Sequence, residues 1–521
     1  MRLRRLRLLN DFKSLTAFDH EFRGPQKAVK AVAPVCLAGL NGSGKSNVIE
    51  AISEIFCHLE LTLLDYEEVT TRAKETELRF EIDYDLQIAG HDPRRIRIRK
   101  DSKQGARFYD LTDEDEEQEM TAWEEQVGSL PTRILGYSSG LNETISAVFG
   151  ANQYWYSEEV GQAARTDRSR NVDHTRTLYM DYDNNAAIAV VNYLFASEDE
   201  KQLFRERVRI DDVHSFRIAV HLKRPNGKAV ETTPEIDDSV KRLKRCAAVA
   251  WYDEGQLLWT FDFFVNDATR NAFLDQFKSA SQLFVTLYKL WLLNSLALDR
   301  ESRRFYTRPT VRKGLIERPP TVPLQDKIFA LTRLRLRIEK PRCVIDYAGI
   351  SDGEHQLLHV FGTITMFKEP NTLFLLDEPE THFNPKWRVD FIHTLNQIAE
   401  KREQEFVLST HSPFLISDCR QANTFQFRRD NGDISVKQVS FETFGASFDY
   451  LLAQLFDLPA MISNQAIEEL REIIHRDNLQ EMLAAVPRFG DSLEKRFLYE
   501  KIAQHPDNQT AVGELNPKEG A

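Results

Sequence analysis

The chain has 521 residues, of which 42% are hydrophobic, 28% charged and 10% aromatic. This length exceeds one compact core of ordinary size and the composition excludes bulk disorder, so we expect two or three folded units, one of them split in sequence. The formal net charge of −12 means that the overall field does not attract nucleic acid, so a nucleic-acid contact needs a local basic surface.

The most apolar stretch, residues 283–298, contains Lys289 and is shorter than a bilayer requires, which favours a buried or interface helix. The N-terminus alternates Arg with Leu and lacks the apolar core of a secretory signal, so we expect a cytoplasmic protein without a membrane partner. The five cysteines lie far apart without a CxxC pair, which argues against a zinc site or a disulfide framework.

A phosphate-binding loop is predicted near the N-terminus. Residues 34–38 form an apolar run that predicts a strand, residues 48–56 have helical spacing, and the intervening residues 39–46 read GLNGSGKS. The glycines let backbone N–H groups and the helix N-terminus point at phosphates. We expect Lys45 to reach the β- and γ-phosphates, Ser46 to ligate Mg²⁺, and the nucleotide to be held by Asn41, Gly42, Ser43, Gly44, Lys45, Ser46 and Asn47.

The pattern of apolar and polar residues changes twice between the phosphate loop and residue 340. Apolar residues alternate with polar ones in residues 78–84 and 96–98, which predicts an antiparallel layer beside the nucleotide and completes a first segment, residues 1–150. Residues 151–340 lack nucleotide-related motifs and predict an inserted α+β lobe, with a strand at 259–265 and helical structure over 270–298. Near its end Arg333, Arg335 and Arg337 alternate with apolar residues, which fits either a solvated stripe or a contact with a phosphate backbone.

Residues 341–445 predict the remaining strands of the nucleotide site. Four apolar residues, 373–376, lead into Asp377 and Glu378, as in a buried parallel strand that ends at a site. We expect Asp377 to hold Mg²⁺ and Glu378 to be the general base that orients and deprotonates the attacking water. A second apolar strand, 406–408, leads to His411, which is placed to contact the γ-phosphate.

The motifs GLNGSGKS, SDGE, LFLLDEPE and THSP, in this order, resemble the nucleotide-binding head of ABC ATPases over residues 1–150 and 340–445. The resemblance implies an α/β head with a mixed sheet, a phosphate loop and an antiparallel β layer, split by the inserted lobe. It implies hydrolysis of ATP to ADP and phosphate with Mg²⁺. It also implies a head-to-tail homodimer or higher oligomer in which Ser351 and Gly353 close on the ATP held by the partner.

The opening LRLLNDFKS, Asn47 and the EPETH segment resemble the RecF/SMC and OLD-like branch of these AAA-family proteins, and not transporter subunits. Asn384 stands where that branch usually has a histidine. The glutamine that normally senses Mg²⁺ has no assigned position, although YSSGLNE at residues 137–143 lies in the expected region. A transporter subunit would also leave the large lobe unexplained.

The remaining residues, 446–521, are patterned as a helical, partner-binding tail that lacks the DxD pair of OLD-family nucleases, so any nuclease must be a separate protein. A lone head with YSSGLNE, THSPF and FGASFDYLLAQLF resembles the PtuA-like ATPases of Septu and retron anti-phage systems. This resemblance implies an HNH-type nuclease partner and, in the retron variant, a reverse transcriptase and its RNA–DNA product. The alternative is a RecF-like ATPase that clamps DNA during repair or chromosome maintenance.

Overall fold

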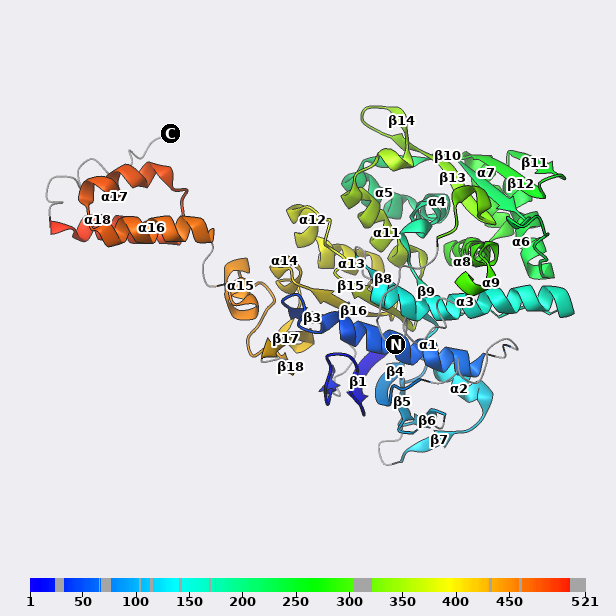
Figure 1. Ribbon diagram of the computed structural model, residues 1–521, viewed down its shortest axis with the longest axis horizontal. Helices are drawn as coiled ribbons and strands as arrows, with labels where there is room; N and C mark the ends of the chain where they lie inside the picture. The colour runs from blue at the N-terminus through cyan, green and yellow to red at the C-terminus, as the bar shows by residue number, and fades with distance from the viewer. Residues whose placement is uncertain are drawn as a thin grey trace. The chain divides into compact units, whose positions relative to one another are not determined.

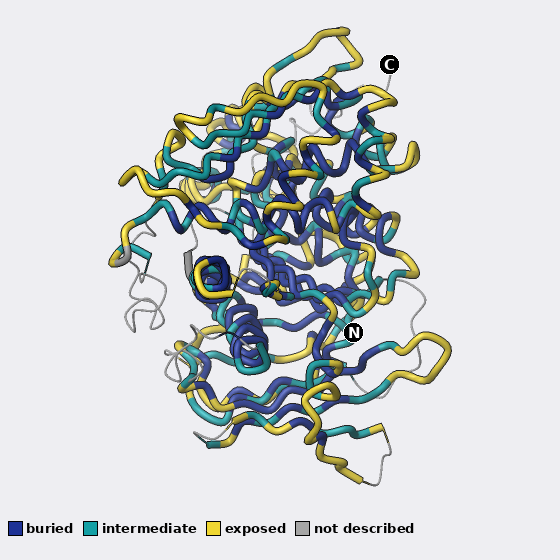
Figure 2. Tube along the Cα trace, turned by 90° about the vertical axis from the view of Figure 1, so that its right-hand side faces the viewer, coloured by how far each residue is buried: buried dark blue, intermediate teal, exposed yellow. Residues whose placement is uncertain are grey.

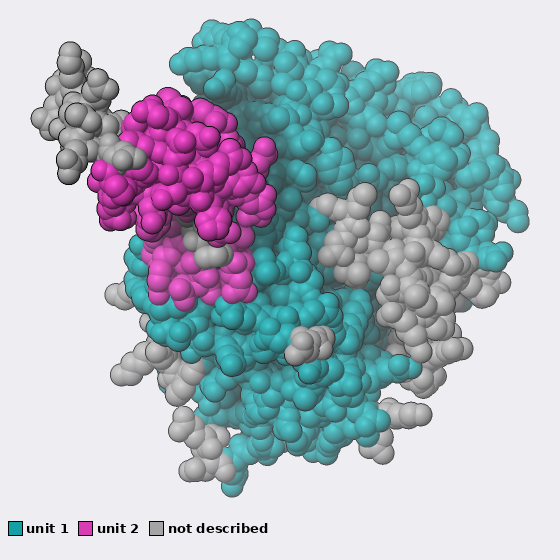
Figure 3. Space-filling view, turned by 60° about the vertical axis from the view of Figure 1, so that its left-hand side comes forward, with its two compact units in different colours: residues 1–445 teal, residues 446–521 magenta. Residues whose placement is uncertain are grey.

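The computed structural model describes residues 1–23, 32–64, 66, 76–102, 105–112, 116–139, 143–167, 170–173, 175–303, 321–430, 433–458 and 462–506. The start of an acidic tract in the sequence, residues 113–119, the middle of the YSSGLNE segment (140–142) and the last residues (507–521) lie wholly or partly outside this set. The chain divides into two compact units, residues 1–445 and 446–521, which Figure 3 distinguishes by colour. Each unit is described by itself.

A seven-stranded sheet in the order β18-β17-β3-β16-β15-β8-β9 forms the centre of the first unit. Its strands pair in parallel, except for the antiparallel β17–β18 hairpin. The inner strands β3, β15 and β16 are buried along their whole length, which explains why their sequences are continuous apolar runs and not alternating ones. The strands are β3 (Val35–Gly39), β8 (Arg133–Ser138), β9 (Thr177–Tyr179), β15 (Thr372–Asp377), β16 (Glu405–Thr410), β17 (Thr424–Asp430) and β18 (Asp433–Gln438).

The two halves of the head interleave within this sheet. β3 and β8 are the strands that the first 150 residues contribute to this sheet. β3 lies between β16 and β17, and β8 lies between β15 and β9, so β3 and β8 do not pair with each other. The segments 1–150 and 341–445 therefore build one sheet together.

An antiparallel six-stranded sheet, ordered β2-β1-β4-β5-β6-β7, forms a second layer. Helix α1 (Lys45–Leu63) lies between the two sheets in Figure 1, and one hydrophobic core joins it to β1 and β4 on one side and to β3 and β15 on the other. Burial on both sides explains why 14 of the 19 α1 residues are buried, and Figure 2 shows the chain coloured by burial. The strands are β1 (Arg2–Leu8), β2 (Asp19–Glu21), β4 (Phe80–Leu86), β5 (Arg94–Lys100), β6 (Arg107–Asp110) and β7 (Gln118–Met120).

The inserted lobe contains a five-stranded antiparallel sheet, ordered β11-β12-β10-β13-β14. The boundary expected at residue 150 falls inside α3 (Glu143–Thr166), and β9 from the inserted segment joins the central sheet. The helical stretch expected over 270–298 is present as two helices and a 3-10 turn: α7 ends at Gln276, and Ser279 caps the next helix. The strands are β10 (Ile210–His221), β11 (Val249–Asp253), β12 (Leu258–Phe264), β13 (Phe329–Ile338) and β14 (Cys343–Asp346).

Helices surround these sheets in the first unit. Helix α11 packs on α4 and α13, which ties the lobe to the central sheet. No helix among the described residues is long and apolar enough to cross a bilayer. The helices are α2 (Trp123–Ser129), α4 (Asn185–Phe195), α5 (Glu198–Val208), α6 (Pro234–Cys246), α7 (Asp267–Gln276), α8 (Ala280–Leu292), α9 (Arg300–Arg303), α11 (Asp352–Met366), α12 (Pro385–Val389), α13 (Phe391–Ala399) and α14 (Pro413–Ile416).

The second unit is helical in its described residues. Helices α16 (Asn464–Arg476), α17 (Leu479–Ala485) and α18 (Leu493–Gln504) follow α15 (Phe448–Phe456) and share a small apolar core, including Leu470, Met482 and Leu498. The expected α/β class, with a mixed sheet, a phosphate loop, an antiparallel layer and a helical C-terminal region, is confirmed.

Candidate ATP-binding site

The phosphate loop connects β3 to α1, where the sequence predicted it. Gly44 caps α1 with φ +95°, a left-handed conformation that glycine adopts at little cost. A Cβ at Gly44 would collide with Cδ1 of Ile434, and one at Gly39 would lie 2.5 Å from the carbonyl oxygen of Phe427. The β17–β18 hairpin thus packs directly against the loop: its backbone leaves no room for a Cβ at Gly39, whereas the Ile434 side chain can move and glycine at Gly44 is favoured by the left-handed φ.

Lys45, the first residue of α1, is buried beside the loop. Its ammonium donates hydrogen bonds to the carbonyl oxygens of Gly39 (2.8 Å) and Leu40 (2.9 Å). Burial lowers the pKa of Lys45, while the carboxylates of Glu378 and Asp377 oppose this shift. The loop thus holds a partly desolvated cation close to the acidic end of β15.

Ser46 and Asp377 meet although they are 331 residues apart in sequence. The Ser46 hydroxyl donates to Asp377 Oδ1 at 2.8 Å, Ser409 Oγ donates to the same oxygen at 2.5 Å, and Ser138 Oγ lies 3.3 Å from Oδ2. Adjacent ends of parallel strands β8, β15 and β16 supply three of these groups. One carboxylate and a hydroxyl are a donor set that fits Mg²⁺, which completes its octahedral shell with phosphate oxygens and water.

Glu378 follows β15 in a left-handed conformation (φ +49°), and its backbone N–H lies 3.2 Å from both the carbonyl oxygen and Oγ of Ser409. Its Oε1 lies 3.2 Å from Nδ1 of His411, at the end of the neighbouring strand. This contact raises the pKa of His411 and lowers the pKa of Glu378, which keeps that carboxylate ionised at neutral pH. The expected base and the expected histidine are therefore direct neighbours.

Glu380 was not singled out from the sequence, yet it is buried beside these groups. Burial raises its pKa to about 7, while a hydrogen bond donated by the Thr410 hydroxyl opposes the shift. The same hydroxyl accepts the backbone N–H of Ser412 at 2.9 Å, on the other side of His411. Glu380 thus supports the turn that carries the histidine. Nothing in the sequence separates this glutamate from an exposed one, because its burial depends on the packing of β16.

Gln356 is a second buried residue that sequence reasoning missed. Its side-chain amide donates to the Tyr137 hydroxyl (3.0 Å) and the Pro379 carbonyl (2.7 Å), and its oxygen accepts the His382 N–H (2.8 Å). It therefore fastens α11 to the turn that follows the acidic strand. In that turn Asn384, which replaces a histidine in the resembling proteins, caps α12 by accepting the Trp387 N–H at 2.9 Å.

The SDGE segment forms the N-terminus of α11. Ser351 and Glu354 form a reciprocal capping box, in which Glu354 Oε2 accepts the Ser351 N–H at 2.8 Å. Gly353 packs on the same turn, because a Cβ there would lie 3.0 Å from the carbonyl oxygen of His382. Ser351 is exposed, so its hydroxyl can be approached from outside the chain.

A cavity of about 480 Å³ lies over the phosphate loop. Six of the seven expected loop residues, all except Ser43, line it with Asp377 and Glu378, whereas His411, Ser351 and Gly353 do not. Ser43 is buried behind the loop.

Three cationic side chains line the cavity, those of Lys45, Lys13 and Arg429. Lys13 pairs with Glu50, and Asn47 donates to the Ser14 hydroxyl at 2.5 Å. The structure thus places Asn41, Gly42, Gly44, Lys45, Ser46, Asn47, Asp377 and Glu378 around one cavity.

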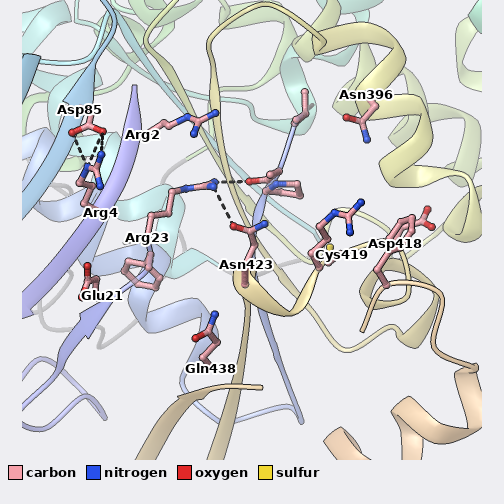
Figure 4. Close-up of a pocket in the computed structure, with 17 residues that line it drawn as sticks. Arg2, Arg4, Glu21, Arg23, Asp85, Asn396, Asp418, Cys419, Asn423 and Gln438 are labelled. Carbon is pink, nitrogen blue, oxygen red and sulfur yellow. Dashed lines mark hydrogen bonds and ion pairs between the residues drawn. The ribbon is translucent and has the colours of Figure 1, made fainter. Parts of the chain in front are cut away.

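A second cavity, of about 690 Å³, lies between β1 and β2 on one side and α13 and the residues 418–423 on the other (Figure 4). Its arginines are matched by internal partners: Arg4 pairs with Asp85 through two contacts of 2.7 Å, and Arg23 pairs with Glu405 (2.8 Å) and Asn423 (3.1 Å). The Arg4 contact lies within the six-stranded sheet, whereas the Arg23 contact with Glu405 of β16 links that layer to the central sheet. We therefore assign this cavity a structural role.

Comparisons with known proteins bear on parts of the chain. Residues 344–417 match the family described as AAA domain, putative AbiEii toxin, Type IV TA system. Protein ea59 of Escherichia phage lambda is 28% identical over 85 residues, which is 16% of this chain and 16% of ea59, so the match spans about a sixth of that relative.

Two solved structures illustrate the wider likeness. The SMC head domain from Thermotoga maritima aligns at 9% identity with a TM-score of 0.34, covering 85% of this chain and all of that domain. The recombination mediator protein RecF of the RecFOR pathway aligns at 12% identity with a TM-score of 0.33, covering 83% and 97%. Scores of this size carry no argument by themselves. The phosphate loop between β3 and α1, the sheet topology and the matched AAA segment are together consistent with a nucleotide-binding α/β head.

Proposed function

We propose that this protein binds ATP with Mg²⁺ and hydrolyses it to ADP and phosphate. The observation that carries the proposal is the 2.8 Å contact between Ser46, at the start of α1, and Asp377, at the end of β15. This contact unites the phosphate loop with an acidic strand that also supplies Glu378. A phosphate-binding loop by itself explains nucleotide binding, whereas an adjacent ionised acid that lines the same cavity explains hydrolysis.

Each residue has a distinct task in this proposal. The loop N–H groups and Lys45 bind the phosphates, and Ser46 and Asp377 hold Mg²⁺, which would neutralise charge on the phosphate oxygens. Glu378 orients a water molecule in line with the γ-phosphorus and accepts its proton as the new O–P bond forms. The bond from the γ-phosphorus to its bridging oxygen breaks, and ADP leaves. His411 holds the Glu378 carboxylate through the 3.2 Å contact.

Steady-state phosphate release by the full chain tests this function. The expected result is Mg²⁺-dependent hydrolysis that is lost in Asp377→Asn, whereas Asp238→Asn, a change of the same chemistry at an exposed acid of the lobe, retains hydrolysis. Hydrolysis that survives chelation of Mg²⁺ and the Asp377→Asn change would remove the proposed site.

We also propose that the active form is a head-to-tail pair. Ser351 and Gly353 do not line the cavity of their own chain, and Ser351 is exposed, so a partner's ATP could be their ligand. Mass in solution, measured for Glu378→Gln with and without ATP and Mg²⁺, should show an ATP-dependent increase. Ser351→Arg should abolish that increase and leave ATP affinity unchanged. A mass that does not respond to ATP would contradict the pairing.

We further propose that the ATPase controls a separate effector, an HNH-type nuclease in an anti-phage complex. Two observations support this role: the matched family's description names a putative toxin of a toxin–antitoxin system, and the chain carries PtuA-like motifs while its residues 446–521 contain no DxD pair. In a retron-linked system the partners would include a reverse transcriptase and its RNA–DNA product. Purification of tagged Glu378→Gln together with the neighbouring gene products tests the role, because recovery without a nuclease would contradict it.

A second candidate function is a RecF-like clamp that holds DNA across paired heads. The exposed arginines of β13 favour it, because they provide a local basic surface on an acidic chain. Capture of DNA by the ATP-bound Glu378→Gln pair, without any nuclease, would select this function.

A further inference from the structure

The five-stranded sheet of the lobe has one covered face and one open face. The covered face presents a stack of aromatic rings, in which Phe216 and Phe263 lie 4.4 Å apart and Phe273 of α7 packs on both. Side chains alternate along a strand, so their neighbours in sequence point the other way. Those neighbours, including Arg217 and Asp262, are partly or fully exposed.

Aromatic and apolar side chains stand on the open face without cover. Trp251 of β11 and Phe264 of β12 are 56% and 52% exposed, and Val249 and Val344 are also exposed. The register places Val249 opposite Asp262 and Trp251 opposite Thr260, so they share the face with polar side chains. Large exposed rings on a sheet cost free energy in water, which suggests that this face has a ligand.

Three arginines at the other side of the same face have no carboxylate partner. Among the described residues, no carboxylate lies within ion-pair distance of Arg333, Arg335 or Arg337, and all three are exposed. Arg333 acts on Asp262 only at longer range, and Arg337 donates to the Val265 carbonyl oxygen at 3.3 Å. Asp346 is opposite Arg335 in the register without reaching ion-pair distance. The acids nearest to this face are engaged elsewhere: Asp262 pairs with Arg217 at 2.6 Å, and Asp212 pairs with Arg270.

Strand β5 shows that this arrangement is not the default for an arginine-rich strand. Its sequence, RRIRIRK, alternates arginine with isoleucine much as β13 does. Its arginines nevertheless face the acidic strand β4: Arg97 lies 2.7 Å from Asp83, Arg99 3.2 Å from Glu81, and Arg95 3.6 Å from Asp85. The chain thus neutralises one such stripe and leaves the other unpaired.

We propose that the open face of this sheet binds single-stranded nucleic acid. Unpaired guanidinium groups attract the phosphate backbone, and exposed rings on a sheet stack with unpaired bases, which a duplex keeps inside its own stack. The local excess of arginine overcomes an overall charge of −12, which would repel nucleic acid elsewhere. The inference goes beyond ATP hydrolysis, and neither depends on the other.

Fluorescence anisotropy of the full chain with dye-labelled oligo-dT and oligo-U tests the proposal. Oligonucleotides of roughly 20 nucleotides exceed the ~4–16 nucleotides that a sheet-based domain covers. The variants are Trp251→Ala and a triple variant, Arg333→Asn with Arg335→Ala and Arg337→Ala; asparagine tolerates the left-handed backbone at Arg333 (φ +52°). A charge-matched control removes Arg471, Arg496 and Lys501, which are exposed in the second unit.

We expect single strands to bind more tightly than a duplex of the same length. Trp251→Ala should weaken binding roughly tenfold or more. The triple variant should lower the slope of log affinity against log salt by about 2, at ~0.7 per phosphate contact, and the control should match the wild type. The relative affinities for oligo-dT and oligo-U identify the natural strand.

Three results would overturn the proposal. If Trp251→Ala and the triple variant bind as tightly as the wild type, any nucleic-acid site lies elsewhere. If the charge-matched control weakens binding as much as the triple variant does, the effect is one of overall charge only. A sheet variant that loses oligomeric mass but keeps its oligonucleotide affinity identifies a protein interface. ATP hydrolysis of the same preparations without oligonucleotide should be unchanged, so failure of the ATPase proposal would be seen separately.

Discussion

The substitution Glu378→Gln separates hydrolysis from binding in this site. Glutamine keeps the length and planarity of the side chain, and the backbone N–H contact with Ser409 remains, so the turn should keep its conformation. The variant loses the charge that orients the water and the oxygen that accepts its proton. A positioned general base contributes roughly 10²–10⁴ in rate, equivalent to ~2.7–5.5 kcal/mol of activation free energy.

The effect on stability should be far smaller than the effect on rate. The ion pair between Glu378 and His411 is partly exposed, with side chains 24% and 39% accessible, so we assign it ~0.2–1 kcal/mol. Because the pKa of His411 is raised, its share of this stability is present at pH below the ordinary histidine value and is lost as pH rises through the raised one. The Glu378 share is lost as pH falls through its lowered pKa. The stability difference should therefore be largest near pH 5–6.

Two assays on the same preparation decide the outcome. Phosphate release should fall by two to four orders of magnitude, whereas the Kd for ATP from calorimetry should stay within about threefold of wild type, since ground-state contacts are retained. Hydrolysis at the wild-type rate would refute the assignment of Glu378 as the base. A parallel loss of ATP affinity would show that the carboxylate acts in binding.

Further predictions concern the residues around this pair. Lys45→Ala should weaken ATP binding roughly 10- to 100-fold in calorimetry, because charge-assisted hydrogen bonds are lost; unchanged affinity would contradict its role. His411→Ala should slow phosphate release with little change in ATP affinity, and a large loss of affinity would make it a structural residue. Glu380→Gln should be stabilised relative to wild type as pH rises from 5 to 8 in thermal melts, because the native Glu380 pKa of about 7 makes ionisation costly there; parallel melting curves would refute this. Gly44→Ala should abolish ATP binding, and adding Ile434→Ala should restore part of it, since the collision with Cδ1 disappears while the φ strain remains; no recovery would leave strain as the whole cause.

The parts of the site that the sequence predicted are those with a fixed local pattern. A glycine-rich loop between a strand and a helix, and a strand ending in Asp377 and Glu378, define their own geometry, so both were located by residue. Their meeting follows from the rule that parallel strands bring their carboxyl ends to one edge. Ser409 and Ser138, which form hydrogen bonds with Asp377, come from the same edge of the sheet. The sequence could not identify them, because that requires the order of the strands.

The parts that the sequence did not predict depend on tertiary packing. Glu380 and Gln356 are polar residues whose roles arise from burial against β16 and the turn after β15. The arginines of β5 and β13 have the same alternation, and only the neighbouring strand decides whether each is neutralised. The helix break at Phe277 also escaped prediction, because the aromatic periodicity continues through the capping residue Ser279.

Because the strands of the central sheet interleave, the ATP-binding site can form only in a chain that has been translated through its second half. Ser46 leaves the ribosome 331 residues before Asp377, a delay of roughly 15–65 s at ~5–20 residues per second. During this time β3 has neither of its neighbours, β16 and β17. In a truncated chain, therefore, the phosphate loop lacks the strands that flank β3. The nucleotide site can form only after the second half of the chain has been translated and its strands have inserted between those of the first half.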